Sequence, residues 1–382
     1  MRVESLVLED FRNYRRAHLE PSPGLNLVVG RNAQGKTNLL EAVYCLSGLG
    51  SPRSPDAALL REGAERALLH GRIRRGDRSI ELDLELGAGR TRALINKAPA
   101  PRPGALAEIA VSVFFGPDEL SLVKGSPEGR RRFLDDLVVK LRPARGGLRR
   151  EWERVLRQRN ALLKSIPRKP GAAAAQTLEI WDDALARAGA GLAAARLEAL
   201  DQLTPLAGRR FRQVAGDGRL ELRYTSAWMD QGDDGAPEER DEARLGELLS
   251  KAVVTARTRE LERGMSLVGP QRDDIVVRLT SSSQGDDLLD ARSHASQGEQ
   301  RTSALALKLG EFDLVTETLR EEPILLLDDV FSELDPQRRS WLGDAVRAAG
   351  QTLLSSAEPG AVEAIGPGRV IEVRAGSLVT DG

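Results

Sequence analysis

The residues with the clearest chemical potential form one short run near the N-terminus: Gly30, Arg31, Asn32, Ala33, Gln34, Gly35, Lys36 and Thr37. This run fits the pattern G-x-x-x-x-G-K-[ST], whose glycines let backbone N–H groups surround the oxygens of a phosphate. In that pattern Lys36 adds a positive charge at the β and γ positions, and Thr37 offers a hydroxyl to Mg²⁺. The sequence therefore predicts a Walker A loop that binds ATP. The simpler alternative is a glycine turn with no ligand.

Two adjacent carboxylates near the other end of the chain suit the same chemistry. Asp328 and Asp329 end an apolar run that starts at Pro323, as expected of a central parallel strand that is buried on both faces. Ligands bind at the carboxyl ends of such strands in open α/β sheets. We expect Asp328 to hold Mg²⁺ as a Walker B acid and Asp329 to orient or deprotonate the attacking water. The alternative is that they cap a turn.

A third motif begins at Ser296. Ser296 and Glu299 fit the S-x-x-E capping box that starts many helices. Beside Walker A and Walker B motifs, the same residues also resemble a degenerate ABC signature, in which a serine hydroxyl and helix N-terminal amides meet the γ-phosphate. We assign Ser296 and Gly298 to this catalytic contact, with a plain helix cap as the alternative.

A D-loop-like segment, residues 332–336, follows the Walker B acids. Asp335 is expected to be the N-cap of the next helix, and Pro336 its first residue. This segment completes the set of motifs found in ABC-type ATPases.

Apolar periodicity predicts the elements that must position these motifs. Turns at 75–77 and 87–89, with strict alternation over 80–86 between them, predict a small antiparallel sheet from about 67 to 97. Helical spacing dominates the middle of the chain, at 127–141, 147–164, 172–204 and 238–263. Short strands are expected at 3–8, 25–29, 111–115, 219–224, 275–279 and 352–356. The helical periodicity does not run through many heptads, which argues against a long SMC-type coiled-coil arm.

These elements predict an α/β fold, an ABC-type ATPase head. The P-loop α/β lobe, with its antiparallel β section, is expected to span residues 1–117 and to return in residues 290–382 with the signature, Walker B and D-loop. A mainly helical second lobe, residues 118–289, is inserted between Walker A and the signature motif.

Composition narrows the class of protein. The 382 residues are 41% hydrophobic, which is enough for a real core. The 56 basic residues are balanced by 57 acidic ones, so the net charge of the whole chain does not indicate whether it binds nucleic acid. No apolar run approaches the ~18 residues needed to span a bilayer, so we expect no membrane segment and a cytoplasmic protein. The only cysteine, Cys45, lies among apolar residues and is expected to be in the core.

Together the motifs resemble those of the RecF family, within the ABC, SMC and double-strand-break-repair group of ATPases. The resemblance covers nearly the full length and includes further blocks at Asp10–Tyr14, Arg61–Glu65, Gly125–Asp135 and Val268–Asp274. It implies an ATP-dependent DNA-binding head for recombinational repair and replication restart. Such a head dimerises with ATP and, with RecR and RecO, helps load RecA at gapped DNA. The resemblance also adds Arg12 to the candidate nucleotide-binding residues.

Three departures from the usual ABC pattern imply slow hydrolysis. Gln297 replaces the first glycine of the signature, Asp329 stands where many relatives have glutamate, and the strand at 352–356 ends without a switch histidine. We therefore expect a weak ATPase that uses ATP as a switch, far below the usual enzyme median of ~10 s⁻¹. Whether ATP hydrolysis makes the chain an enzyme in its own right stays open.

The position of any DNA contact stays open as well. Arginines crowd the start of the helical lobe, namely Arg130, Arg131, Arg132, Arg142, Arg145, Arg149, Arg150, Arg154, Arg157 and Arg159. Their forked side chains suit phosphate contact, but they could equally pair with nearby acids on solvated helix faces. An ATP-switched regulator of a protein partner, without DNA contact, is therefore an alternative function. A transporter ATPase is disfavoured because the blocks at 125–135 and 268–274 do not resemble that class.

Overall fold

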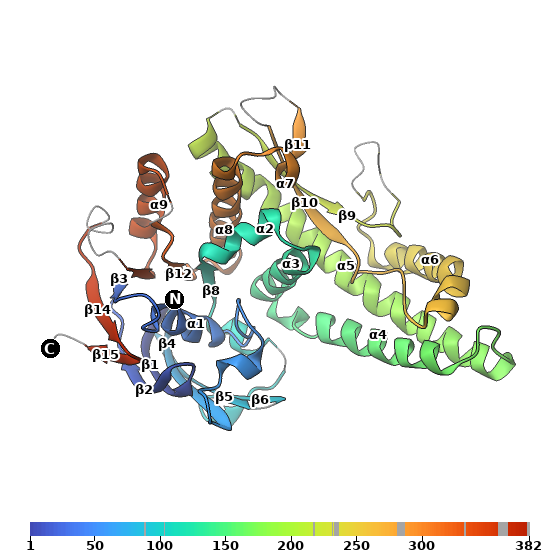
Figure 1. The fold of residues 1–382 in the computed structure, drawn as a ribbon, viewed down its shortest axis with the longest axis horizontal. Helices are drawn as coiled ribbons and strands as arrows, with labels where there is room; N and C mark the ends of the chain where they lie inside the picture. The colour runs from blue at the N-terminus through green and yellow to red at the C-terminus, as the bar shows by residue number, and fades with distance from the viewer. Residues whose placement is uncertain are drawn as a thin grey trace. The chain divides into compact units, whose positions relative to one another are not determined.

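The computed structural model in Figure 1 describes residues 1–379 apart from 88, 103, 217, 231, 233–236, 281–286, 332–333 and 358–365. The chain forms two compact units, and both are discontinuous in sequence. The first contains residues 1–120, 206–217 and 301–382, and the second contains 121–205 and 218–300. This division departs from the expected one chiefly at 206–217, which packs with the first unit, and at 290–300, which packs with the second.

A mixed sheet of six strands forms the centre of the first unit, in the order β15-β14-β3-β13-β12-β8. All neighbours are parallel except β14 and β15. Its strands are β3 (Gly24–Val29), β8 (Ser112–Phe115), β12 (Ile324–Asp328), β13 (Gln351–Ser356), β14 (Arg369–Arg374) and β15 (Ser377–Val379). Every residue of β12 is buried, and β12 runs parallel to both of its neighbours. This confirms the predicted buried parallel strand, which lies between β13 and the edge strand β8 and not at the centre of the sheet.

The predicted antiparallel section is a second six-stranded sheet in the first unit, in the order β2-β1-β4-β5-β6-β7. Its strands are β1 (Arg2–Phe11), β2 (Tyr14–Leu19), β4 (Arg66–Arg75), β5 (Arg78–Gly87), β6 (Arg90–Ile95) and β7 (Ala98–Pro99). Leu82, Leu84 and Leu86 share the core cluster with α1 (Lys36–Cys45), which includes the buried Cys45. An added Cβ on Gly71 would lie 2.7 Å from the Leu46 side chain at the end of α1, so a larger residue there would have to displace that buried leucine.

Two longer helices also belong to the first unit, α9 (Pro336–Ala348) and α8 (Gln297–Leu319) from Arg301 onward, with short 3-10 turns at η1 (Asp56–Leu59), η2 (Leu106–Glu108) and η3 (Pro117–Leu120). The last turns of α5 (Ala172–Ala215) pack against α8. A Cβ on Gly310 would lie 2.9 Å from the Cα of Ala207, and Arg210 forms a two-pronged ion pair with Asp313. These contacts explain why α5 runs past the predicted end at 204 and through Pro205.

The second unit is mainly helical, as predicted. Its helices are α2 (Ser121–Lys124), α3 (Pro127–Leu141), η4 (Pro143–Arg145), α4 (Leu148–Ser165), most of α5, α6 (Glu242–Arg263) and α7 (Ala291–His294). A small antiparallel sheet accompanies them, in the order β11-β10-β9, from β9 (Leu220–Thr225), β10 (Asp274–Thr280) and β11 (Leu288–Asp290). Among the described residues, none of the helices is long and apolar enough to cross a bilayer.

Candidate functional site

The Walker A residues Gly30–Thr37 form the loop between β3 and α1, as predicted. Gly35 has a φ of 117°, and an added Cβ would lie 2.6 Å from the Asn13 Nδ2 and 3.0 Å from the Tyr14 hydroxyl. Glycine is therefore required both by the backbone and by the packing. Gly35 gives α1 no side-chain cap, so the first N–H groups of the helix remain suited to an anion.

Lys36 is the first residue of α1, and its side chain turns back over the loop. The ammonium Nζ donates to the carbonyl oxygens of Gly30 at 2.8 Å and Arg31 at 3.2 Å. The residue is only 7% exposed. The positive charge is therefore fixed at the loop, where a β- or γ-phosphate would need it, rather than extended into solvent.

The hydroxyl of Thr37 meets the carboxylate of Asp328 at the carboxyl end of the central sheet. Thr37 Oγ1 lies 2.8 Å from both Oδ1 and Oδ2 of Asp328. Mg²⁺ prefers oxygen ligands and usually combines one or two carboxylates with phosphate oxygens and waters. These two side chains, both proposed as metal ligands from sequence, fit that donor set.

Ser355 is a further site residue that the sequence reasoning missed. It lies on β13 directly across from Asp328 in the parallel register, and its hydroxyl donates to Asp328 Oδ1 at 2.6 Å. In the sequence, the strand at 352–356 is distinguished only by ending without a histidine. Its pairing with the Walker B strand is the signal that would place Ser355 beside the acid.

Asp329 adopts a left-handed backbone with a φ of 51°. Its N–H donates to the carbonyl oxygen and to the hydroxyl of Ser355, both at 3.1 Å. Non-glycine residues in this conformation carry a backbone cost of about 1–3 kcal/mol and cluster at functional sites. Aspartate and asparagine tolerate it best, which gives a physical reason for aspartate rather than the longer glutamate here.

The turn between β1 and β2 supports the Walker A loop from outside. Asn13 Nδ2 donates to the carbonyl of Gln34 at 2.8 Å, and the Tyr14 hydroxyl donates to the carbonyl of Gly35 at 3.0 Å. Burial raises the pKa of Tyr14, so the phenol remains a neutral donor. The block Asp10–Tyr14, a weak signal in the sequence alone, thus has a clear structural role.

Arg12 belongs to the same turn but binds protein groups. Its guanidinium donates from Nε and Nη2 to the two carboxylate oxygens of Glu41 on α1, each at 2.8 Å. It also donates to the carbonyl of Ala58 at 2.7 Å and contacts the Ser54 hydroxyl. Because Glu41 is fully buried on α1, the Arg12 guanidinium balances its negative charge. A contact between Arg12 and nucleotide stays a prediction.

The residues at the start of α8 form the predicted capping box. The Ser296 N–H donates to Glu299 Oε2 at 2.8 Å, and the Glu299 N–H donates to Ser296 Oγ at 3.3 Å. Gly298 lies in the first turn that this box begins. The cap is confirmed, whereas the signature role of Ser296 and Gly298 stays a prediction.

The expected D-loop is described only in part. Asp335 is the N-cap of α9, because its carboxylate accepts from the Arg338 N–H at 3.0 Å, and Pro336 is the first helical residue. Both features agree with the sequence analysis. Ser332 and Glu333 of this motif lie outside the described residues.

Two blocks of the family resemblance meet inside the second unit. Arg130 donates from Nε and Nη2 to both carboxylate oxygens of Asp274, each at 2.8 Å. Arg196 joins the carboxylate of Asp135 to the carbonyl of Pro270. These blocks at 125–135 and 268–274 therefore form a structural core.

Several arginines of the cluster proposed for DNA contact are buried or paired with acids. Arg130 is only 5% exposed, and Arg159 is fully buried between Asp182 and Glu260. These two arginines cannot form part of a DNA-binding surface, because buried partners already neutralise them. Arg149 and Arg154 are exposed but pair with acids on their own helix.

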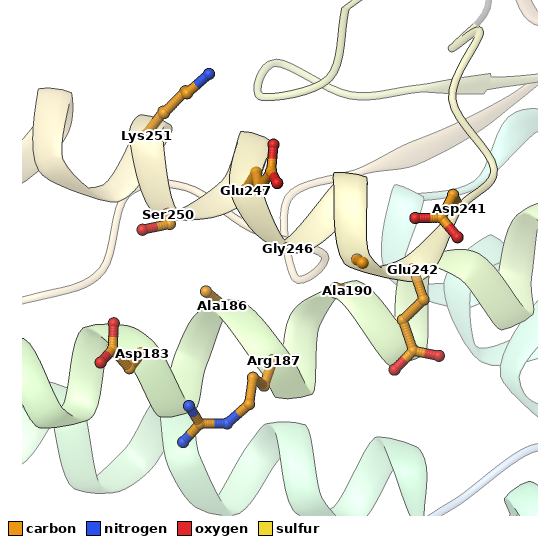
Figure 2. A pocket seen from close by; sticks show the side chains of 11 residues that line it. Asp183, Ala186, Arg187, Ala190, Asp241, Glu242, Gly246, Glu247, Ser250 and Lys251 are labelled. Atoms are coloured by element: carbon orange, nitrogen blue, oxygen red, sulfur yellow. The ribbon is translucent and has the colours of Figure 1, made fainter.

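A hollow between α5 and α6 in the second unit is shown in Figure 2. Small residues line it from both helices, Ala186 and Ala190 from α5 and Gly246 from α6. Carboxylates outnumber cations among its lining residues, with Asp183, Asp241, Glu242 and Glu247 against Arg187 and Lys251. This charge disfavours a phosphate ligand, so the nucleotide site is expected at the Walker A loop instead.

Three features define an ATPase head of the ABC type. They are the Walker A loop before α1, the acid Asp328 at the end of the buried strand β12, and the capped, signature-like start of α8. Residues 2–375 match the sequence family described as the RecF/RecN/SMC N terminal domain. The chain belongs to the RecF family. It is 44% identical to the DNA replication and repair protein RecF of Beutenbergia cavernae, over 94% of each chain. It is also 43% identical to the RecF of Streptomyces avermitilis, again over 94% of each chain.

Solved structures agree with this assignment. The structure described as the recombination mediator protein RecF-ATP in the RecFOR pathway matches with a TM-score of 0.86 and 27% identity, covering 100% of this chain and 97% of that one. An SmcHead structure bound to the C-winged helix domain of ScpA matches with a TM-score of 0.53 and 16% identity, covering 99% of this chain and 96% of that one. The second likeness concerns the fold alone.

Proposed function

We propose that this chain is an ATP-dependent DNA-binding protein of recombinational repair and replication restart. In this proposal it dimerises on binding ATP and helps load RecA at gapped DNA, together with RecR and RecO, in the cytoplasm. The observation that carries the proposal is the meeting of Thr37 with Asp328 at 2.8 Å beside the Walker A loop. The relatives' names, which refer to DNA replication and repair, and the RecF-ATP structure support it.

ATP and Mg²⁺ are the proposed ligands of this site. The amides of Gly30–Thr37 and the ammonium of Lys36 would bind the phosphates, while Thr37 and Asp328 would hold the metal. When bound, Mg²⁺ neutralises charge on the β- and γ-phosphates. Ser355 orients the Asp328 carboxylate through its hydrogen bond of 2.6 Å.

Hydrolysis is proposed to be slow. Asp329 is the candidate group that orients or deprotonates water, and the two hydrogen bonds from its N–H to Ser355 fix its backbone. An aspartate reaches less far than a glutamate, so water activation is expected to be weaker. ATP would then act as a switch between a monomer and a dimer.

The proposed dimer is head-to-tail with two shared sites. The chain contains one Walker A loop and one signature-like helix start. Ser296 and Gly298 of one copy would contact the γ-phosphate bound by the other. A γ-phosphate adds acceptor oxygens for the amides and hydroxyl at that helix start, so ATP should favour association more than ADP does.

Measurement of affinity for single-stranded, duplex and gapped DNA, with ATP or ADP and with or without RecR, tests the function. The proposal expects tighter binding with ATP and a log affinity that falls steeply with log salt, because phosphate contacts release counterions. An absence of DNA binding under every condition would favour the rival, an ATP-switched regulator of a protein partner. Arg130 pairs with Asp274 and Arg159 pairs with Glu260. Because these two arginines are not available to DNA, this observation favours the rival function.

A triple variant tests whether the exposed arginines carry that contact. Replacement of Arg149, Arg150 and Arg154 by glutamine should weaken binding evenly across sequences and flatten the salt slope. Arg150 should account for most of the effect, since the other two already pair with Glu153 and Glu151. An unaltered dependence of log affinity on log salt would mean that these side chains do not contact DNA and only form a solvent-exposed helix face.

A further inference from the structure

Arg338 on α9 contacts two residues of the first unit, Thr302 and Asp335, that lie far apart in the chain. Its Nε donates to the Thr302 hydroxyl on α8 at 2.7 Å. Its Nη1 forms an ion pair with the carboxylate of Asp335. One planar guanidinium thus connects the helix that starts at the capping box with the N-cap residue that follows the Walker B acids.

The two partners lie close to the candidate catalytic groups along their own elements. Thr302 is in the second turn of α8, about 9 Å along the helix axis from Ser296 at 1.5 Å per residue. Asp335 is the N-cap of α9 and follows the Walker B acids in the chain. Of the described residues between Asp329 and Asp335, Val330, Phe331 and Leu334 are buried, with exposed fractions of 4%, 2% and 7%.

The geometry requires an arginine. A guanidinium holds its N–H donors in a rigid plane, so binding Thr302 with one donor and Asp335 with another fixes the angle between them. A lysine would keep the charge but could not impose this angle. Thr302 is only 2% exposed, which makes its bond to Arg338 a specific one and not a solvated surface contact.

We propose that Arg338 is a positioning residue that couples the start of α8 to the N-cap of α9. The inference rests on the proposed function, in which Ser296 contacts the nucleotide of a second copy. Placement of Ser296 by that nucleotide would then be transmitted along α8 to Thr302 and through Arg338 to Asp335, so ATP-driven association would depend on Arg338.

A purely structural role makes a different prediction. The side chains of Arg338 and Asp335 are 27% and 40% exposed, and exposed pairs of this kind add little to stability. A second pair on α9, Arg347 with Asp344, has the same spacing along the helix. Arg347→Gln is therefore the matched control, because it removes a comparable pair near the far end of the helix.

The test compares Arg338→Gln, Arg338→Lys, Thr302→Val and Arg347→Gln in the full chain. ADP affinity should be unchanged in all four, since none touches the Walker A loop. The dissociation constant of the ATP-bound dimer, from light scattering with Mg²⁺, should rise at least fivefold in Arg338→Gln and Arg338→Lys, within the usual range for coupled sites. Thr302→Val should act in the same direction, and combining it with Arg338→Gln should add nothing. Arg347→Gln should behave as wild type.

Two failures can be told apart. If wild type associates with ATP and Arg338→Gln associates equally well, the coupling is wrong while the proposed dimer stands. If Arg338→Lys associates as well as wild type does, the positive charge is sufficient and the rigid geometry of the guanidinium is not needed. The positioning role is then wrong. If wild type does not associate with ATP at all, the proposed dimer is wrong and the inference fails with it.

Discussion

The Thr37 hydroxyl lies 2.8 Å from both carboxylate oxygens of Asp328, although 291 residues separate them in the chain. The sheet order explains this proximity, because β13 lies between β3, which leads into the Walker A loop, and β12, which ends at Asp328. Ser355 on β13 consequently sits beside the acid and donates to it at 2.6 Å. The candidate metal site thus depends on a strand that contributes no recognised motif.

Ser355→Ala should weaken Mg²⁺-dependent ATP binding by roughly tenfold, because a hydrogen bond to a charged group contributes about 1.5–3 kcal/mol. Calorimetric titration with ATP, with and without Mg²⁺, would measure the effect. Ser356→Ala is the matched control, since the next side chain on a strand points to the opposite face. Equal affinities in the two variants would remove Ser355 from the site.

Lys36→Ala should abolish detectable ATP binding while leaving the fold intact. The ammonium donates to the loop carbonyls of Gly30 and Arg31, so its loss removes the phosphate-binding charge without opening the core. Circular dichroism and ATP titration would check the two halves of this prediction. Lys124→Ala, on the second unit, is the control. An ATP affinity like that of wild type would show that the loop does not bind phosphate in the expected way.

Asp329→Asn should block hydrolysis and preserve ATP binding. Asparagine tolerates the left-handed backbone at this position, and the N–H bonds to Ser355 are kept. Asp328 can still hold the metal, but the carboxylate that orients water is lost. Phosphate release and ATP affinity would be measured on the same preparation. Hydrolysis at the wild-type rate would exclude Asp329 from catalysis.

Much of the ATPase lobe could be predicted from the sequence because its signals are local. The glycine spacing around Lys36, the apolar run before Asp328 and the S-x-x-E pattern at Ser296 each reflect one element and its end. Such local rules carry over to the structure when tertiary contacts agree with them. The loop, the buried strand and the capping box were all found where they were expected.

The remaining features depend on contacts between distant segments. Nothing near Tyr14 in sequence reveals that its hydroxyl supports the carbonyl of Gly35. The continuation of α5 past Pro205 depends on Gly310 of α8, more than a hundred residues away in the chain. Arg159 looks like a surface residue in the sequence, because Asp182 and Glu260, which bury it, come from other helices.

Asp273 should make the stability of the protein depend on pH. It is 1% exposed, and it accepts from the Tyr224 hydroxyl at 2.8 Å and from Trp228 Nε1 at 3.0 Å. Burial raises its pKa to about 6, above the ~3.9 of an unfolded aspartate. The folded state therefore binds the proton more tightly, so this contribution to stability is present at low pH and is lost as pH rises through 6.

Comparison with Asp273→Asn isolates this effect. Relative to that variant, wild type should gain about 1 kcal/mol in free energy of unfolding when pH falls from 7 to 5. Urea unfolding at both pH values would measure the difference, with Asp183→Asn, an exposed position on α5, as the control. A constant difference between wild type and Asp273→Asn at the two pH values would contradict the prediction.

Ser296→Arg should bind ATP normally yet remain monomeric with ATP and Mg²⁺. The substitution removes the hydroxyl that accepts from the Glu299 N–H and places a bulky cation where the proposed partner's γ-phosphate would approach, but it leaves the chain's own Walker A loop unchanged. Light scattering with ATP, and with ADP as the reference, would measure association. Because a damaged cap could also fray α8, Ser296→Asp, which keeps a capping oxygen but repels phosphate, should fail to dimerise as well.

Mixing variants makes the same prediction sharper. In a head-to-tail dimer of Ser296→Arg with Lys36→Ala, one of the two sites combines an intact Walker A loop from the first variant with an intact helix start from the second. The mixture should therefore recover part of the ATP-driven association that each variant lacks alone. A pair of sites each built within one chain could not be restored in this way, since both kinds of chain would remain defective. Association of Ser296→Arg alone to the wild-type extent would mean that residues 296–299 form only a helix cap and that the sites are not shared.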